Sequence, residues 1–346
     1  MRLEAGTWNR EAQAALLARG ARREEEARAR LVAADFGTIR GEALALAERP
    51  GDATEAPGRA TLFADLLEAA RASDDAPAEA RLADALDREI ERLVGQLDRR
   101  TPPHALRALA RCLATLGGER HSSRARRLAA ALRASLAGAS GPEAPTAMAA
   151  RVSCLGQAAA GGTDLAERFE EGVRCLLSSQ DTNGGWSDPG EGGDATARVL
   201  DDALALALLR DPAGGGAIAV AAAGARALAR LASTQSPSGD WRGDLPATIA
   251  TLRAAILLLP ALESRHPDAL AAAAWPAGSR DGRFVERGFA WCLSRKPDLG
   301  WGEPEAPVAE GRAALARAVA GIALVREHGA FRSGDPLAPA RARGLA

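Results

Sequence analysis

The stretch that decides the fold is GVRCLLSSQDTNGGW, residues 172–186. Its helical part ends at Gln180, and the Gly184-Gly185 pair permits the chain to reverse before Trp186. A glutamine close to a helix end can hydrogen-bond carbonyl groups that have no partner within the helix, and an indole can pack back over that end. The stretch therefore predicts a helix, a tight turn, and a tryptophan that ties one helical hairpin to the next.

Two later segments repeat this pattern, ALARLASTQSPSGDW at 227–241 and GFAWCLSRKPDLGW at 288–301. Each begins with a small residue, reaches a polar residue eight steps later, and ends a short Gly turn on Trp. The tryptophans are 55 and 60 residues apart, which indicates a helical-hairpin repeat with one long connection. In the third copy Lys296 replaces the glutamine, and the turn is one residue shorter. We assign the structural role in these repeats to Gln180, Trp186, Gln235, Trp241 and Trp301.

The first copy, Gly-x-x-x-Leu-Leu-x-x-Gln-x-x-x-Gly-Gly-Trp, resembles the QW repeat of squalene–hopene cyclases and related terpene cyclases. The wider group includes protein prenyltransferase β-subunits and thioester-domain toroids. The resemblance covers about residues 170–330, roughly half of the chain. It implies an all-α fold, an (α/α)6 toroid in which inner and outer helices alternate around a ring.

Helical periodicity extends over almost the whole chain and predicts about twelve helices. Alanine, leucine, arginine and glutamate are good helix formers, and the chain is rich in them, whereas aromatic residues make up only 3%. An all-β or sheet-dominated fold is therefore excluded. The predicted spans are 9–34, 38–48, 58–72, 77–98, 102–116, 122–138, 143–159, 164–179, 196–210, 216–234, 246–264 and 280–295, with a further helix at about 308–328.

No long linker divides the chain, so we expect a single domain over 1–330, with divergent N-terminal hairpins and a loose tail at 331–346. The net charge of −1 argues against a general nucleic-acid binder. The N-terminus has no apolar signal-peptide core, and the most apolar stretches, 217–223 and 254–262, are shorter than the roughly 20 residues of a membrane span. A cytoplasmic protein is expected, with no transmembrane segment.

The near absence of lysine suggests a GC-rich, bacterial genome. The four cysteines form no CxxC pair, so we expect reduced thiols packed in helices.

The resemblance implies a class II cyclase acid, the middle Asp of an Asp-x-Asp-Asp motif, but this sequence contains no such motif. The nearest string is Val-Leu-Asp-Asp at 199–202, and Asp194 lies just upstream of it. Adjacent residues on an α-helix point about 100° apart, which predicts that Asp201 and Asp202 do not face one site equally. We favour the simpler interpretation, in which these aspartates are solvated or cap and charge a helix N-terminus.

The other catalytic and metal-binding residues that the resemblance implies are also missing from the sequence. Carbocation chemistry uses aromatic faces, yet the chain has six Trp, six Phe and no Tyr. No histidine stands at a zinc-ligand spacing from a cysteine or another histidine, and the thioester Cys-Gly-Glu-Gln motif is absent.

Two functional hypotheses remain open. The first is a binding or interaction protein without catalytic motifs, which holds an apolar, isoprenoid-like small molecule or a protein partner in a cavity lined by Ala and Leu. The second is a divergent isoprenoid cyclase or prenyl-transfer enzyme, in which Asp194, Asp201 or Asp202 is the acid or a diphosphate–metal ligand. No cofactor is expected, and a divalent metal would be needed only by the enzyme.

Overall fold

The computed structural model describes the chain in segments that cover most of residues 56–294. They are 56–72, 76–97, 101–116, 144–158, 163–188, 193–210, 216–243, 245–279 and 282–294, with short pieces at 44–45, 48, 130, 327–329, 331–333, 335 and 338. The all-α class is confirmed, because these segments are almost entirely helical. The predicted helix at 9–34 and nearly all of those at 38–48, 122–138 and 308–328 lie outside the described residues, as do Lys296 and Trp301.

The first described helices pack as neighbours in the order of the sequence. They are α2 (Ala56–Ala72), α3 (Ala76–Gly95), α4 (Pro103–Leu116), α6 (Pro145–Ala158) and α7 (Thr163–Ser178). Helix α2 packs against α3 and α4, α4 against α6, and α6 against α7. Leu82, Leu86, Ile90 and Leu93 form an apolar stripe along α3 and are buried, and α3 packs against α2.

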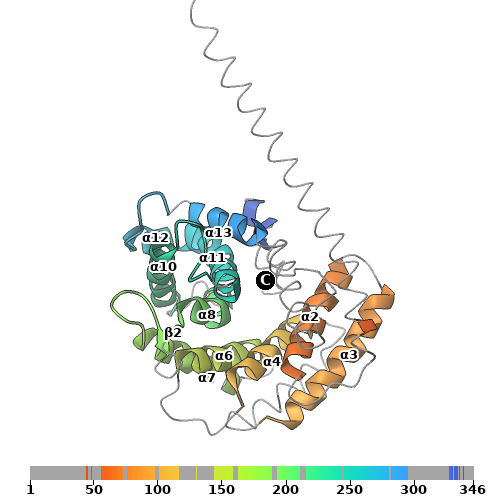
Figure 1. Cartoon of the computed structure of the whole chain (residues 1–346). Helices are drawn as coiled ribbons and strands as arrows, with labels where there is room; N and C mark the ends of the chain where they lie inside the picture. Colours follow the sequence, from red (N-terminus) through yellow and green to blue (C-terminus); the bar gives the residue numbers. More distant parts are fainter. Residues whose placement is uncertain are drawn as a thin grey trace, which may run out of the picture.

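The second half begins with a two-residue antiparallel pair, β1 (Ser187–Asp188) and β2 (Gly193–Asp194), which closes the loop after Trp186. The helices that follow are α8 (Thr196–Val199), η3 (Leu200–Leu204), α9 (Ala205–Arg210), α10 (Ala217–Thr234), α11 (Leu245–Arg265), α12 (Pro267–Ala272) and α13 (Arg283–Ser294). The sequence did not predict α12, a short helix with Pro267 at its first position. The labelled helices lie along an arc from α2 and α3, through α4 and α6, to α8, α11 and α13 (Figure 1).

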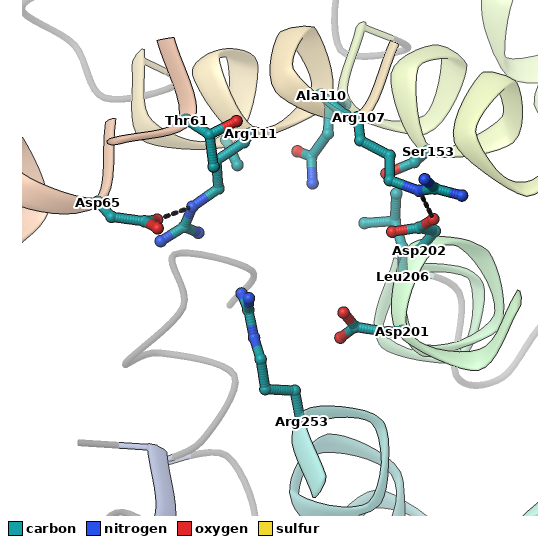
Figure 2. A pocket seen from close by; sticks show the side chains of 12 residues that line it. Thr61, Asp65, Arg107, Ala110, Arg111, Ser153, Asp201, Asp202, Leu206 and Arg253 are labelled. Atoms are coloured by element: carbon teal, nitrogen blue, oxygen red, sulfur yellow. Dashed lines mark hydrogen bonds and ion pairs between the residues drawn. The ribbon is translucent and has the colours of Figure 1, made fainter. Parts of the chain in front are cut away.

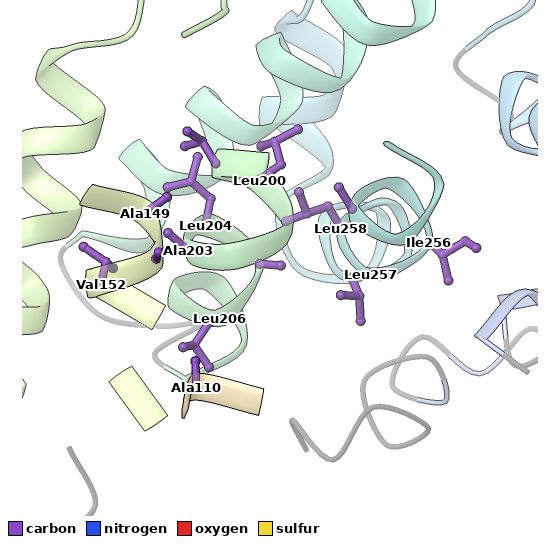
Figure 3. Packing of buried hydrophobic residues seen from close by; sticks show 14 of the residues in the cluster. Ala110, Ala149, Val152, Leu200, Ala203, Leu204, Leu206, Ile256, Leu257 and Leu258 are labelled. Atoms are coloured by element: carbon purple, nitrogen blue, oxygen red, sulfur yellow. The ribbon is translucent and has the colours of Figure 1, made fainter. Parts of the chain in front are cut away.

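The segment predicted as one helix at 196–210 is helical throughout, but its middle turn, η3, is a π-helix. Leu200 and Leu204 of this turn are fully buried and lie between α6 and α11. Figure 3 shows them together with Val152 of α6 and Leu258 of α11. One apolar cluster of buried residues extends from α2 to α13. Phe331, at the start of the expected loose tail, packs against this cluster.

Two helices are apolar over longer stretches than the 217–223 and 254–262 segments expected from the sequence. Residues Ala217–Thr234 and Ala247–Arg265 would be long and apolar enough to cross a membrane by length and composition alone. In the folded chain 61% and 72% of these windows are buried. The expectation that the chain has no transmembrane segment stays a prediction.

Candidate functional site

The first repeat forms a joint between two hairpins. Gln180 donates two hydrogen bonds from Nε2, to the Gly184 carbonyl in its own turn and to the Ala223 carbonyl of α10, both at 3.0 Å. The indole Nε1 of buried Trp186 donates to the Leu176 carbonyl near the end of α7 at 2.8 Å. These contacts confirm that the glutamine satisfies carbonyl groups and that the tryptophan folds back over the helix end.

The second repeat reproduces this joint contact by contact. Gln235 donates from Nε2 to the carbonyls of Gly239 and Phe284, both at 2.8 Å. The Nε1 group of Trp241 donates to the Leu231 carbonyl at 2.8 Å. An arginine of the next helix, Arg287, donates to Oε1 of Gln235, as Arg226 does to Oε1 of Gln180. The repeat residues Gln180, Trp186, Gln235 and Trp241 therefore hold the helix pairs together.

Asp194 belongs to the first of these joints. Its Oδ1 accepts a hydrogen bond from the Thr196 N–H at 2.9 Å, at the start of α8. Its Oδ2 lies 3.3 Å from Nη2 of Arg230, whose Nη1 also reaches Asp181 at 3.4 Å. Asp194 is not among the residues that line the pocket described next. The structure thus brings together two of the three candidate carboxylates, Asp201 and Asp202, and leaves Asp194 apart from them.

A pocket of about 200 Å³ lies between α2, α4, α6, η3 and α11 (Figure 2). Its lining contains three arginines and three aspartates, so the formal charges of the lining cancel. The complete lining is Thr61, Asp65, Arg107, Ala110, Arg111, Ala114, Ser153, Gln157, Asp201, Asp202, Leu206 and Arg253. This pocket differs from the expected cavity of Ala and Leu, because Ala110, Ala114 and Leu206 form only part of its wall.

Two ion pairs form opposite sides of the pocket. Nε of Arg107 on α4 lies 2.5 Å from Oδ2 of Asp202, and the two side chains are 27% and 15% exposed. Nε of Arg111, one turn further along α4, lies 2.5 Å from Oδ1 of Asp65 on α2, with 12% and 8% exposed. Charge-assisted bonds of this length between partly buried side chains hold both arginines in place. They join three helices around the pocket.

Arg253 is the third arginine and enters the pocket from α11. Figure 2 shows its side chain pointing toward the space between Asp65 and Asp201. Its Nε lies 3.6 Å from Oε2 of buried Glu327, a distance too long for a hydrogen bond. Burial alone would lower the pKa of Arg253. The negative charges of Glu327 and, after it, Asp201 have the larger combined effect, so the pKa of Arg253 is raised above its usual value. The guanidinium is therefore positively charged.

Two successive aspartates of the π-helical turn, Asp201 and Asp202, both line this pocket. The expectation that they do not face one site equally stays a prediction. A π turn closes hydrogen bonds five residues apart and therefore turns less per residue than an α-helix, so neighbouring side chains diverge less. Such turns are frequent at functional sites.

Sequence reasoning did not select Arg107, Arg111, Arg253 or Asp65. One local signal was present, because Arg253 is the sole charged residue between Leu245 and Leu262. A lone charge in such an apolar helix indicates an inward-facing functional or paired side chain. The four-residue spacing of Arg107 and Arg111 gave a second, weaker signal that the two guanidinium groups share one helix face.

The cysteines offer no reactive thiol to this site. Cys112, Cys154 and Cys292 are buried, whereas Cys175 is exposed on α7, and all four are free. Burial raises the pKa of each buried thiol, that of Cys292 to about 12. Thiols with such pKa values are inert at neutral pH. Within the described segments, no group of three or more His, Cys, Asp or Glu side chains is placed to hold a metal ion.

Comparison with known proteins gives no relative from which a function could be transferred. No family model matches the chain, and neither the curated proteins nor the solved structures contain a match. The function therefore has to be argued from the pocket.

Proposed function

We propose that this chain is a binding protein with a terpene cyclase-like toroidal arrangement of helices, and that its pocket holds a small polar molecule. The observation that supports the proposal is the lining of three arginines and three aspartates, contributed by four separate helical segments. Convergent charged groups in a concave site fix the orientation of a ligand and give specificity. The repeated Gln–Trp joints supply the rigid scaffold that such a site needs.

The size and chemistry of the pocket favour a different class of ligand from the apolar one expected from the sequence. Pockets for drug-sized ligands measure about 300–1,000 Å³. A volume of about 200 Å³ suits a smaller molecule. Placing an apolar chain against the charged groups would break their contacts with water and return no hydrogen bonds. We therefore propose a small polar ligand for this pocket in place of an isoprenoid-like one.

The proposal is tested by ligand binding to the intact chain. Thermal shift measurements with a panel of sugars, amino acids, hydroxy acids and sugar phosphates should identify stabilising compounds, because a ligand that binds only the folded state raises its stability. The substitution Ala114→Met, which adds bulk to the pocket wall, should abolish the shift. Ala147→Met, on α6 outside the pocket lining, is the matched control. If no compound in the panel shifts wild type, or if Ala114→Met leaves the shifts unchanged, this pocket is not a ligand site.

The second candidate function is the divergent isoprenoid cyclase or prenyl-transfer enzyme. One observation favours it: Asp201 and Asp202 both belong to the π-helical turn η3 and both line the same pocket. The ion pair with Arg107 argues against Asp202 as a proton donor, because it uses the carboxylate form. Incubation with geranyl, farnesyl and geranylgeranyl diphosphates and squalene, followed by GC–MS, would detect a product. Product formation that is lost in Asp201→Asn with folding intact would establish the enzyme.

A further inference from the structure

The N–H groups of Arg253 are hydrogen-bond donors that the pocket can offer to a ligand. A guanidinium carries five N–H donors in a planar fork. The ion pair with Glu327 at 3.6 Å involves Nε, and within the described part of the chain no hydrogen bond engages any donor of Arg253. Arg107 and Arg111, by contrast, each donate from Nε to an aspartate at 2.5 Å. Arg253 is therefore the pocket arginine whose Nε is not engaged by an aspartate and whose N–H donors are available to a ligand.

The position of Arg253 adds to this difference. Its side chain is only 15% exposed, so water satisfies its donors poorly. Arg is the side chain that matches a planar or tetrahedral oxyanion with two parallel N–H bonds. Asp201 and Asp202, on η3, line the same pocket, and their carboxylates can accept hydrogen bonds. The pocket thus presents both a donor fork and carboxylates to a ligand.

We infer that the ligand carries an oxyanion, a carboxylate or a phosphate monoester, that Arg253 binds through its guanidinium fork, and a hydroxyl or amino group that faces the aspartates. This inference rests on the proposed function, since it names the class of ligand for the same pocket. The equal numbers of arginines and aspartates in the lining support the hydroxyl or amino group of the ligand as well as its oxyanion. A ligand that brought negative charge alone would place this charge close to the three carboxylates of the lining, which repel it.

The direct test is calorimetric titration of the intact protein with three probes. Glycerate and glycerol 3-phosphate carry an oxyanion next to hydroxyl groups, whereas glycerol carries the hydroxyl groups alone. We expect one or both anions to bind at least tenfold more tightly than glycerol, as a charged hydrogen-bonded contact implies. Binding of glycerate alone would identify a carboxylate ligand, and binding of glycerol 3-phosphate alone a phosphate ligand; both results support the inference.

Three variants separate Arg253 from the rest of the pocket. Arg253→Gln should weaken binding of the anion about tenfold or more. Arg253→Lys keeps the positive charge beside Glu327 and with it the fold, but it loses the fork and should also weaken binding. Arg265→Gln removes an exposed arginine from the last turn of the same helix and should bind as wild type does.

The outcomes distinguish this inference from the proposed function. If the anions bind wild type and both Arg253 variants equally, or if glycerol binds as well as they do, the inference is overturned while the pocket remains a ligand site. If neither anion binds and the thermal shift panel responds to neutral sugars but to none of its amino acids, hydroxy acids or sugar phosphates, the inference again fails alone. The proposed function fails only if no compound of the panel raises the melting temperature of wild type, or if Ala114→Met leaves these thermal shifts unchanged.

Discussion

At the scale of single residues, Asp240 shows how a turn in the second repeat depends on one charge. Its carboxylate accepts hydrogen bonds from the hydroxyls of Ser236 and Ser238 and from the Gly243 N–H, each at 2.5 Å. These bonds, those from Ser236 and Ser238 first, lower the pKa of Asp240 to about 2. The carboxylate therefore stabilises the folded state above the ordinary pKa of Asp, and this contribution is lost as the pH falls from about 4 through 2.

Asp240→Asn should accordingly lower the free energy of unfolding by about 1–2 kcal/mol at pH 7. The difference from wild type should shrink as the pH is lowered below 4. Urea denaturation of both proteins at pH 7, 5, 4 and 3 measures it. Asp84→Asn, on the exposed face of α3, is the control and should stay within about 0.5 kcal/mol of wild type. A difference that stays constant down to pH 3 would contradict the role of the charge.

The residue scale also shows what the sequence could and could not predict. Gln180, Trp186, Gln235 and Trp241 were identified because their contacts lie in the turn and in the next helix of a repeated pattern. Asp65 and Arg111, in contrast, are 46 residues apart in the chain. No local pattern indicates that such residues meet, so the arginines of the pocket were missed.

At the scale of elements, the repeat turns bring backbone segments unusually close together. Gly239 has a φ of +103°, and a Cβ at this position would lie 2.5 Å from the Arg287 carbonyl oxygen. Gly184 is its counterpart, with a φ of +82° and 2.9 Å to the Arg226 carbonyl oxygen. Each turn therefore requires glycine both for its backbone conformation and for the approach of the next helix.

Gly239→Ala should destabilise the protein by about 2–4 kcal/mol, since it combines a positive φ with a steric overlap. Gly58→Ala in α2 is the matched control, because a Cβ there meets nothing within 4 Å, and it should be neutral or stabilising by up to about 1 kcal/mol. Thermal or urea unfolding gives both values. Equal stabilities of the two variants would show that the turns are looser than the close contact implies.

Periodicity located most of the described helices, although not α12, and the predicted spans at 58–72, 102–116 and 216–234 lie within two residues of α2, α4 and α10. The π turn in η3 could not be predicted in this way. Its sequence, LDDAL, has no glycine or proline, and Leu200 and Leu204 of this turn are buried where η3 contacts α6 and α11. These contacts join segments far apart in the chain, so periodicity could not indicate them.

At the scale of the whole molecule, the pocket is where distant parts of the chain meet. Arg107 on α4 and Asp202 on η3 are 95 residues apart in sequence and form an ion pair at 2.5 Å. The pair links the N-terminal hairpins, which lack the Gln–Trp repeat, to the repeat-containing half. The hairpins and their order could be predicted from the sequence, whereas this link could not, because it depends on how the hairpins curve around the pocket.

A double-mutant cycle measures whether the two halves are held together in this way. Arg107→Gln and Asp202→Asn, singly and combined, should give a coupling energy of about 1–3 kcal/mol in urea unfolding, because the side chains are only 27% and 15% exposed. The same cycle at Arg81 and Glu48, a pair with 54% and 65% exposed, should give about 0.5 kcal/mol or less. Solvent screens the second pair and leaves the first in a low-dielectric site, so the ratio of the two energies reports on the pocket itself. Equal coupling energies in the two cycles would mean that the pocket is open to water and that the halves are not joined through Arg107 and Asp202.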